Sequence, residues 1–253
     1  MESSPTAPAA AVHTAPRTDV SQDQGKFRIH FNFPGRAVPD HEDHGYGPLA
    51  TVVESFLDPG TLIGMHQHRD EEIISWVPGG VMRHEDRQGN EMVVDAESLL
   101  VMGAGEGVWH AEETLPSDPP LRMLQIFVRP PERGLEPTIQ HEPIPAAVIG
   151  EWRHLFGPRE AGAPLTVRNE VDLYDAQLEE GAELSLPARP GRHTYLYVFE
   201  GAVELAGSSL AATESALVAD DRTETIRARE PTALVAFSID PDAPVTRHGT
   251  IGR

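Results

Sequence analysis

The chain has 253 residues and a formal net charge of −20, and 39% of its residues are hydrophobic. This length can bury a sizeable core in one or two domains. The negative charge argues against nucleic acid or an anionic membrane as a direct partner, because both repel an acidic surface. The absence of cysteine excludes disulfides and thiolate metal ligands and suits a cytoplasmic protein. No apolar run approaches the roughly 18 residues that suggest a membrane span.

The first 25 residues are small, polar and rich in proline. They lack the basic start and the apolar centre of a secretory signal, which again suits a cytoplasmic location. A segment of this composition cannot bury enough apolar surface to offset the entropy of ordering it. We therefore predict a disordered N-terminal tail over residues 1–25.

Short β-branched apolar runs follow, separated by Gly, Pro, Asp and Asn, as in LATVVESFL, EIISWV and LRMLQIFV. Strands with turn residues at short spacing indicate an all-β sandwich or barrel. The turn residues from Asp86 to Asn90 predict a hairpin between VMRHE and EMVV. A proline-rich segment around residue 135 interrupts the strand pattern, so we assign residues 26–135 to a first barrel.

A second series of strands begins near residue 164, after a segment over 136–163 that we interpret as a connector. The apolar run that ends at Gly201 echoes the run that ends at Gly79, because each closes in a glycine turn before another strand. This weak internal repeat predicts a duplicated barrel over residues 164–253. The second copy has no His-x-His pattern, so we expect it to be metal-free and structural.

Two segments about 40 residues apart carry imidazole and carboxylate groups at the spacing of strands. The candidates are His66, His68 and Glu72 in the first segment and His110 and Glu112 in the second. Alternate residues of a strand point to the same face, and Glu72 has the same parity as the first two histidines. Two adjacent strands could therefore aim all five groups into one cavity.

This donor set is typical of an accessible metal site. Neutral imidazole and carboxylate suit Fe(II), Mn, Ni, Cu or Zn. Three histidines and one glutamate leave positions open on a metal that accepts five or six ligands, as activation of a substrate or O₂ requires. A structural zinc site would more often use cysteine in a closed shell. We predict one divalent metal ion, and this donor set leaves its identity open among these metals.

The spacing of the first segment matches the first cupin motif, and the second keeps Gly-x-x-His with Gly105 where that motif usually has proline. The segments RHEDRQGN and GAGEGVWHAEE resemble the pirin family, and within it the bacterial pirin-like quercetin 2,3-dioxygenases. The resemblance is strong over about residues 31–131 and weaker over about 172–240. It implies two tandem cupin barrels of the double-stranded β-helix (jelly-roll) type, the first metal-binding and the second degenerate.

The resemblance also implies which residues hold the metal. Pirins use the carboxylate two residues after the histidine of the second motif, which gives the ligands His66, His68, His110 and Glu112. Many cupins use the carboxylate of the first motif instead, here Glu72, and this alternative stays open. If Glu112 is the ligand, Glu72 would orient a ligand imidazole or hold a proton near the substrate.

Three further positions belong to the same signatures. Ala111 stands where pirins commonly have serine, and we expect it to face away from the metal with little chemical consequence. His84 and Asp86 match a pirin signature, but they lie beside the predicted hairpin turn, so we expect a surface role for both.

The resemblance implies an iron-type dioxygenase that opens flavonols such as quercetin with O₂ and releases carbon monoxide. Glu112 or Glu72 would accept the proton of the flavonol hydroxyl. One alternative is a metal-dependent regulatory pirin that acts through a protein partner, and another is a cupin enzyme on a different small phenolic or enediol substrate. We expect a monomer, because two fused barrels can bury each other's sheets.

Overall fold

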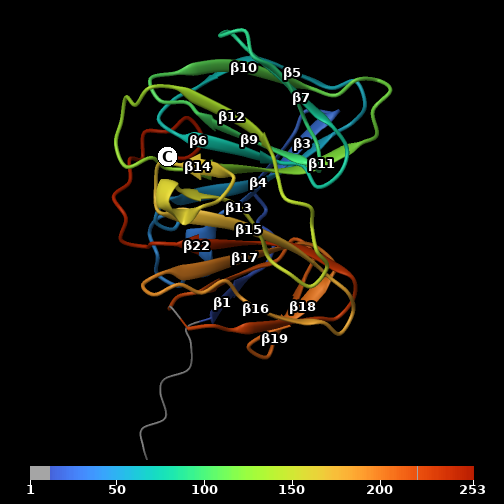
Figure 1. Ribbon diagram of the computed structural model, residues 1–253, viewed down its shortest axis with the longest axis vertical. Coiled ribbons are helices and arrows are strands. Elements are labelled where there is room, and N and C mark those ends of the chain that lie inside the picture. The colour runs from blue at the N-terminus through green and yellow to red at the C-terminus, as the bar shows by residue number, and fades with distance from the viewer. Residues whose placement is uncertain (1–11, 221) are drawn as a thin grey trace, which may run out of the picture.

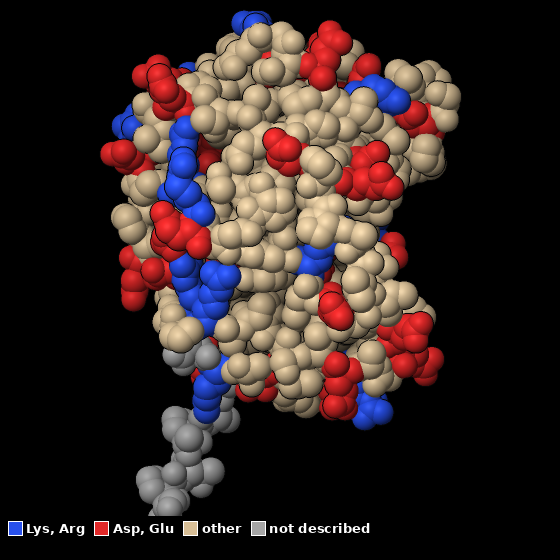
Figure 2. Space-filling model, viewed as in Figure 1, with Lys and Arg blue, Asp and Glu red and all other residues tan. Residues whose placement is uncertain are grey.

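The computed structural model describes residues 12–220 and 222–253, and nearly all of its regular structure is strand. Two barrels lie one above the other along the long axis of the molecule (Figure 1). Within the described part of the chain, no helix is long and apolar enough to cross a membrane. On the face seen in Figure 2, the acidic side chains form several separate groups, so the negative charge is not concentrated in one patch there.

The first barrel pairs a seven-stranded sheet, in the order β12-β9-β6-β11-β4-β3-β2, with a four-stranded sheet, in the order β5-β10-β7-β8. All neighbouring strands in both sheets are antiparallel. A short 3-10 turn, η1 (Pro34–Ala37), precedes β4. The strands are β2 (Ser21–Asp23), β3 (Phe27–Asn32), β4 (Leu49–Leu57), β5 (Leu62–His68), β6 (Glu72–Trp76), β7 (Met82–Asp86), β8 (Glu91–Val94), β9 (Ser98–Gly103), β10 (Val108–Glu113), β11 (Leu121–Val128) and β12 (Thr138–Pro143).

The second barrel repeats this arrangement, with sheets in the order β1-β20-β17-β22-β15-β13-β14 and β16-β21-β18-β19. The repeat confirms the predicted pair of tandem cupin barrels. A second 3-10 turn, η2 (Arg159–Ala161), follows β13. The strands are β1 (Val12–Ala15), β13 (Arg153–Pro158), β14 (Leu165–Val167), β15 (Val171–Leu178), β16 (Glu183–Ser185), β17 (His193–Glu200), β18 (Ala202–Leu205), β19 (Ser208–Ala211), β20 (Ser215–Val218), β21 (Thr225–Ala228) and β22 (Thr232–Ile239).

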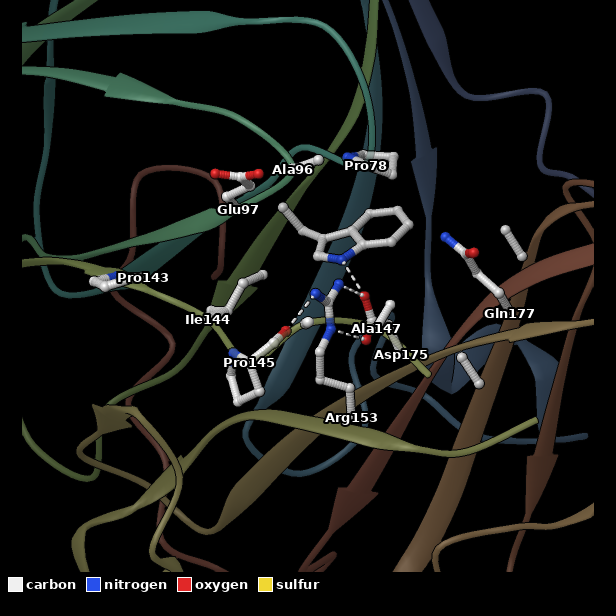
Figure 3. A pocket seen from close by; sticks show the side chains of 14 residues that line it. Pro78, Ala96, Glu97, Pro143, Ile144, Pro145, Ala147, Arg153, Asp175 and Gln177 are labelled. Carbon is white, nitrogen blue, oxygen red and sulfur yellow. Dashed lines mark hydrogen bonds and ion pairs between the residues drawn. The ribbon is translucent and has the colours of Figure 1, made fainter. Parts of the chain in front are cut away.

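The two large sheets pack against each other and form one apolar core between the barrels. Alternation along the strands explains this: Ile74 and Trp76 of β6 face the second barrel, whereas Ile73 faces the interior of the first. The Trp76 indole donates a hydrogen bond to Asp175 (3.0 Å), and Arg153 pairs with the same carboxylate. These three residues line a cavity of about 430 Å³ between the barrels (Figure 3).

The ends of the barrels differ from the predicted boundaries. Residues 12–25 are not a disordered tail, because β1 pairs with β20 of the second barrel and β2 pairs with β3 of the first. A polar segment gains backbone hydrogen bonds at a sheet edge even where it buries little apolar surface. Residues 1–11 lie outside the described part of the chain. Within the predicted connector, β12 extends the first barrel's sheet and β13 extends the second's.

Candidate metal centre

Three imidazoles meet inside the first barrel, as the motif spacing predicts. His66 and His68 end strand β5, and His110 lies on the adjacent strand β10, directly opposite His66. One nitrogen from each ring can be chosen so that all three lie within 4.8 Å of one another. The ring centroids are 4.4–5.1 Å apart. The pairing of two strands thus brings together residues that lie more than 40 positions apart in the chain.

Hydrogen bonds orient the two imidazoles of β5. His66 donates its Nδ1–H to the carbonyl oxygen of Gly64 (2.9 Å), and His68 donates its Nδ1–H to the carboxylate of Glu71 (2.5 Å). A histidine that donates from Nδ1 keeps its proton there and presents the lone pair of Nε2, which is the form that binds metals. Both rings are therefore set up as Nε2 ligands.

His110 carries the clearest sign that the site is built for a cation. Its Nδ1 lies 3.3 Å from Nδ1 of His84, while its Nε2 is buried and finds no hydrogen-bond partner among the described residues. An unpartnered buried nitrogen costs roughly 1–3 kcal/mol, and a bound metal ion would use its lone pair. Burial and the three neighbouring imidazoles lower the pKa of His110 to about 2, so it is neutral, as a ligand must be. The residues present therefore fit a divalent metal.

Glu112 flanks the group of three imidazoles. Its carboxylate is buried, and both of its oxygens accept hydrogen bonds from the Gln125 side-chain amide (2.8 and 2.7 Å). A bulge between His110 and Glu112 shifts the pairing of β10 with β5 at this point. Burial raises the pKa of Glu112 to about 7, and the nearby His68 partly opposes this rise. A cation beside this carboxyl would favour its charged form.

The structure turns Glu72 away from the imidazoles. Asp70 has a positive φ of 50°, which ends β5 before β6 begins, so parity counted from His68 does not carry across the turn. Glu72 accepts a hydrogen bond from the backbone N–H of Arg168 (2.8 Å) and lines a cavity of about 530 Å³ on the side of the second barrel. The role of orienting an imidazole, expected for Glu72, falls in this geometry to Glu71.

His84 and Asp86 are not surface residues. His84 is 2% exposed, and β7 pairs with β10 so that His84 lies opposite Glu112 and Asp86 lies opposite His110. The Asp86 carboxylate accepts hydrogen bonds from Asn90 and so caps the hairpin turn. The expectation failed because a residue beside a turn can still point into the barrel.

Sequence reasoning missed two residues of the site, Glu71 and Gln125. Gln125 lies on β11 and has no local pattern that marks it. Glu71 is adjacent to the motif glutamate, but the turn at Asp70 decides which of the two carboxylates faces His68. The alternate spacing of His84 and Asp86 was a usable signal, since two polar residues of one parity share a strand face.

Comparison with known proteins gives matches over both barrels. The family "Pirin" matches residues 14–128, and "Quercetinase C-terminal cupin domain" matches residues 155–239. A pirin-like protein of Caulobacter vibrioides is 30% identical over 212 residues, which is 83% of this chain and 90% of that protein. A quercetin 2,3-dioxygenase of Escherichia coli K12 is 25% identical over 197 residues, 78% of this chain and 84% of the other.

Solved structures show the same fold. YhhW from Escherichia coli superposes with a TM-score of 0.77 at 22% identity, covering 94% of this chain and 100% of that one. The bacterial pirin YhhW in complex with nickel(II) gives a TM-score of 0.77 at 21% identity, covering 90% and 98%. At these identities the structural likeness supports the fold alone. The sequence matches extend over both barrels and include a relative at 30% identity: the chain belongs to the pirin family.

Proposed function

We propose that the protein is a metal-dependent dioxygenase that opens flavonols such as quercetin with O₂. The observation that carries the proposal is the group of three imidazoles, two of them oriented by hydrogen bonds, with the buried Nε2 of His110 that has no partner among the described residues. The name of the Escherichia coli relative supports the reaction. The proposed ligands are His66, His68, His110 and Glu112. The proposed metal is Fe(II), with Mn, Ni, Cu and Zn as alternatives.

A cavity of about 520 Å³ beside His66 suits a substrate of this kind. Its volume falls within the range of small-molecule pockets, roughly 300–1,000 Å³. Phe27 and Ile63 provide apolar wall, and Lys26 is a cation at the same opening. A flat aromatic molecule with an acidic hydroxyl matches this combination. The lining residues are Gln24, Lys26, Phe27, Gly60, Thr61, Leu62, Ile63, Gly64 and His66.

The protein's own groups would handle the hydroxyl proton and exclude water. When bound, the metal would act as a Lewis acid that lowers the pKa of the flavonol hydroxyl, and it would offer open coordination positions to O₂. Glu112, kept in its charged form by the bound cation, would accept the proton as a general base. Gln125 holds that carboxylate in place, and buried Phe127 and Val108 keep the site dry. The products of the reaction between the flavonol and O₂ would be a depside and carbon monoxide.

A second candidate function is regulation through a protein partner. The outer face of the small sheet exposes Leu62 and Val93 (66% and 50% exposed) beside the carboxylates of Glu85 and Glu91. An apolar patch with a charged rim is typical of a protein contact. The metal ligand proposed at Glu112 lines the same hollow, so metal binding could alter this surface.

The deciding experiment measures carbon monoxide release from quercetin in air by protein reconstituted with Fe(II). The variant His66→Ala/His68→Ala is compared with the parent, and His13→Ala, outside the site, is the control. We expect release by the parent and the control, and none above background from the double variant. Iron-loaded parent protein that releases no carbon monoxide would overturn the substrate assignment and favour the second candidate.

A further inference from the structure

Glu71 connects the metal centre to a distant part of the chain. Its side chain is fully buried. One carboxylate oxygen, Oε1, accepts the hydrogen bond from His68 Nδ1 (2.5 Å). The other, Oε2, accepts hydrogen bonds from the backbone N–H groups of Ile251 (2.9 Å) and Gly252 (2.7 Å). A single carboxylate therefore bridges a proposed metal ligand and residues 180 or more positions away.

Those residues belong to a segment, 246–253, that leaves the second barrel after β22 and crosses to the first. We call it the tail strap. Its end lies beside β6 of the first barrel (Figure 1). Arg129, which is completely buried, donates hydrogen bonds to the backbone oxygens of Gly252 and Arg253 (both 3.2 Å). Asp43 pairs with the guanidinium of Arg129 (2.7 Å), so the charge that holds the strap is itself compensated.

Two further contacts fix the strap next to the imidazoles. The side chain of Ile251 packs on the apolar cluster that contains Phe127. The centroids of the Phe127 and His68 rings are 6.0 Å apart. The hydroxyl of Thr250 accepts a hydrogen bond from the backbone N–H of Arg69, the residue after His68 (3.1 Å). Backbone, side-chain and apolar contacts therefore all place the strap against this corner of the site.

The strap approaches Glu71 so closely that a side chain at Gly249 would force the carboxylate or the strap to shift. A Cβ atom added at Gly249 would lie 2.7 Å from Oε2 of Glu71, and one added at Gly252 would lie 3.2 Å from the same atom. The first distance is a clash and the second leaves little room. The carboxylate is thus enclosed by the strap on one side and by His68 on the other.

We infer that Glu71 is a positioning residue for His68 and that the tail strap is the clamp that holds Glu71 in place. The inference rests on the proposed function only in taking His68 as a metal ligand. With Oε2 held by two N–H groups, Oε1 is fixed where it keeps the His68 proton on Nδ1 and leaves Nε2 free. Outer partners of this kind typically change metal affinity by about 10–100-fold. The strap follows β22 of the second barrel, so the second barrel would thereby contribute to the metal centre of the first.

The test changes each side of the clamp and measures metal binding rather than turnover. Glu71→Gln retains the size of the side chain but places an NH₂ group against either His68 or the strap. Gly249→Ala adds a methyl group against the same carboxylate from the other side. Glu106→Gln, at an exposed glutamate, and Gly79→Ala, at a glycine with open space, are the matched controls. Thr250→Val removes one contact of the strap and serves if Gly249→Ala does not fold.

Two readouts apply to folded protein. Long-range ¹H–¹⁵N NMR on the metal-free protein reports the His68 tautomer, and competition titration with Co(II) reports affinity. We expect the Nδ1–H tautomer of His68 in the parent to be lost in Glu71→Gln. Co(II) affinity should fall about 10–100-fold in Glu71→Gln and Gly249→Ala, and it should stay within about twofold of the parent in both controls. An unchanged tautomer and affinity in Glu71→Gln would overturn the inference even if quercetin is cleaved. Failure to cleave quercetin would leave these results unaffected.

Discussion

The two barrels share one strand arrangement and differ in what fills their small sheets. In the first, His110 lies opposite His66 across β10 and β5. In the second, Ile226 lies opposite Leu184 across β21 and β16, at the same place in the sheet order. The fold therefore accepts either an imidazole pair or an aliphatic pair at this position.

The same replacement recurs on the next strand. His84 lies opposite Glu112 in the first barrel, whereas Val203 lies opposite Ala228 in the second. Apolar burial stabilises by roughly 25 cal/mol per Å², while buried polar groups destabilise unless they are paired. The first barrel thus retains groups that do not help it to fold, which is expected of a binding site. The second shows the interior that stability alone would favour.

The largest effect on metal affinity is expected when the imidazole pair of the first barrel is replaced by the aliphatic pair of the second, which removes the difference between the barrels at this position. In His66→Leu/His110→Ile, the first barrel takes the aliphatic pair of the second. We expect Co(II) affinity to fall roughly 1000-fold or more, about 4 kcal/mol, because two of three imidazoles are lost. Without metal, we expect urea unfolding to show the variant at least as stable as the parent, because the unpartnered nitrogen of His110 is gone.

The reverse change is the control. Ile226→His places one imidazole in the apolar interior of the second barrel, where it has no partner set. We expect lower stability and no added metal binding. Retention of tight Co(II) binding by the His66→Leu/His110→Ile variant would contradict the assignment of these residues as ligands.

Much of this comparison could be predicted from the sequence. Alternating apolar runs and glycine turns indicate strands. The spacing of His66, His68 and His110 then predicts that the three side chains lie on one face of paired strands. The choice between neighbouring Glu71 and Glu72 could not be predicted, because the positive φ of Asp70 resets the alternation. The contacts of the tail strap could not be predicted from the sequence either, because they depend on how the two barrels pack and leave no periodic pattern in residues 246–253.

A smaller effect, on the pH dependence of stability, is expected at the boundary between the barrels, where Glu72 is buried. Burial raises the pKa of Glu72 from its ordinary 4.5 to about 7, although the backbone N–H of Arg168 opposes the rise. The folded protein therefore holds this proton more tightly than the unfolded chain, and stability falls as pH rises from about 4.5 to 7. The difference between the two pKa values corresponds to roughly 3 kcal/mol.

Glu72→Gln should remove that fall, because the amide cannot ionise and its oxygen can still accept the Arg168 N–H. Urea unfolding at pH 5 and pH 8 measures the effect. We expect the parent to lose on the order of 3 kcal/mol more than the variant between the two pH values. Exposed Glu106→Gln is the control and should follow the parent. Parallel profiles for the parent and Glu72→Gln would show that Glu72 is not protonated in the folded protein at pH 5 to 7.

The smallest effect is expected on the outer face of β10. Ala111 lies between His110 and Glu112 on the opposite face of β10 and is buried (3% exposed), whereas its counterpart in β21 is the exposed Arg227, between Ile226 and Ala228. Because such different residues occupy this position in the two barrels, Ala111→Ser should leave Co(II) affinity within about twofold and change stability by less than about 1 kcal/mol. The same titration and unfolding measurements apply. A tenfold loss of affinity would mean that the outer face of β10 also governs the metal centre, and the contrast between the barrels would then extend beyond their interiors.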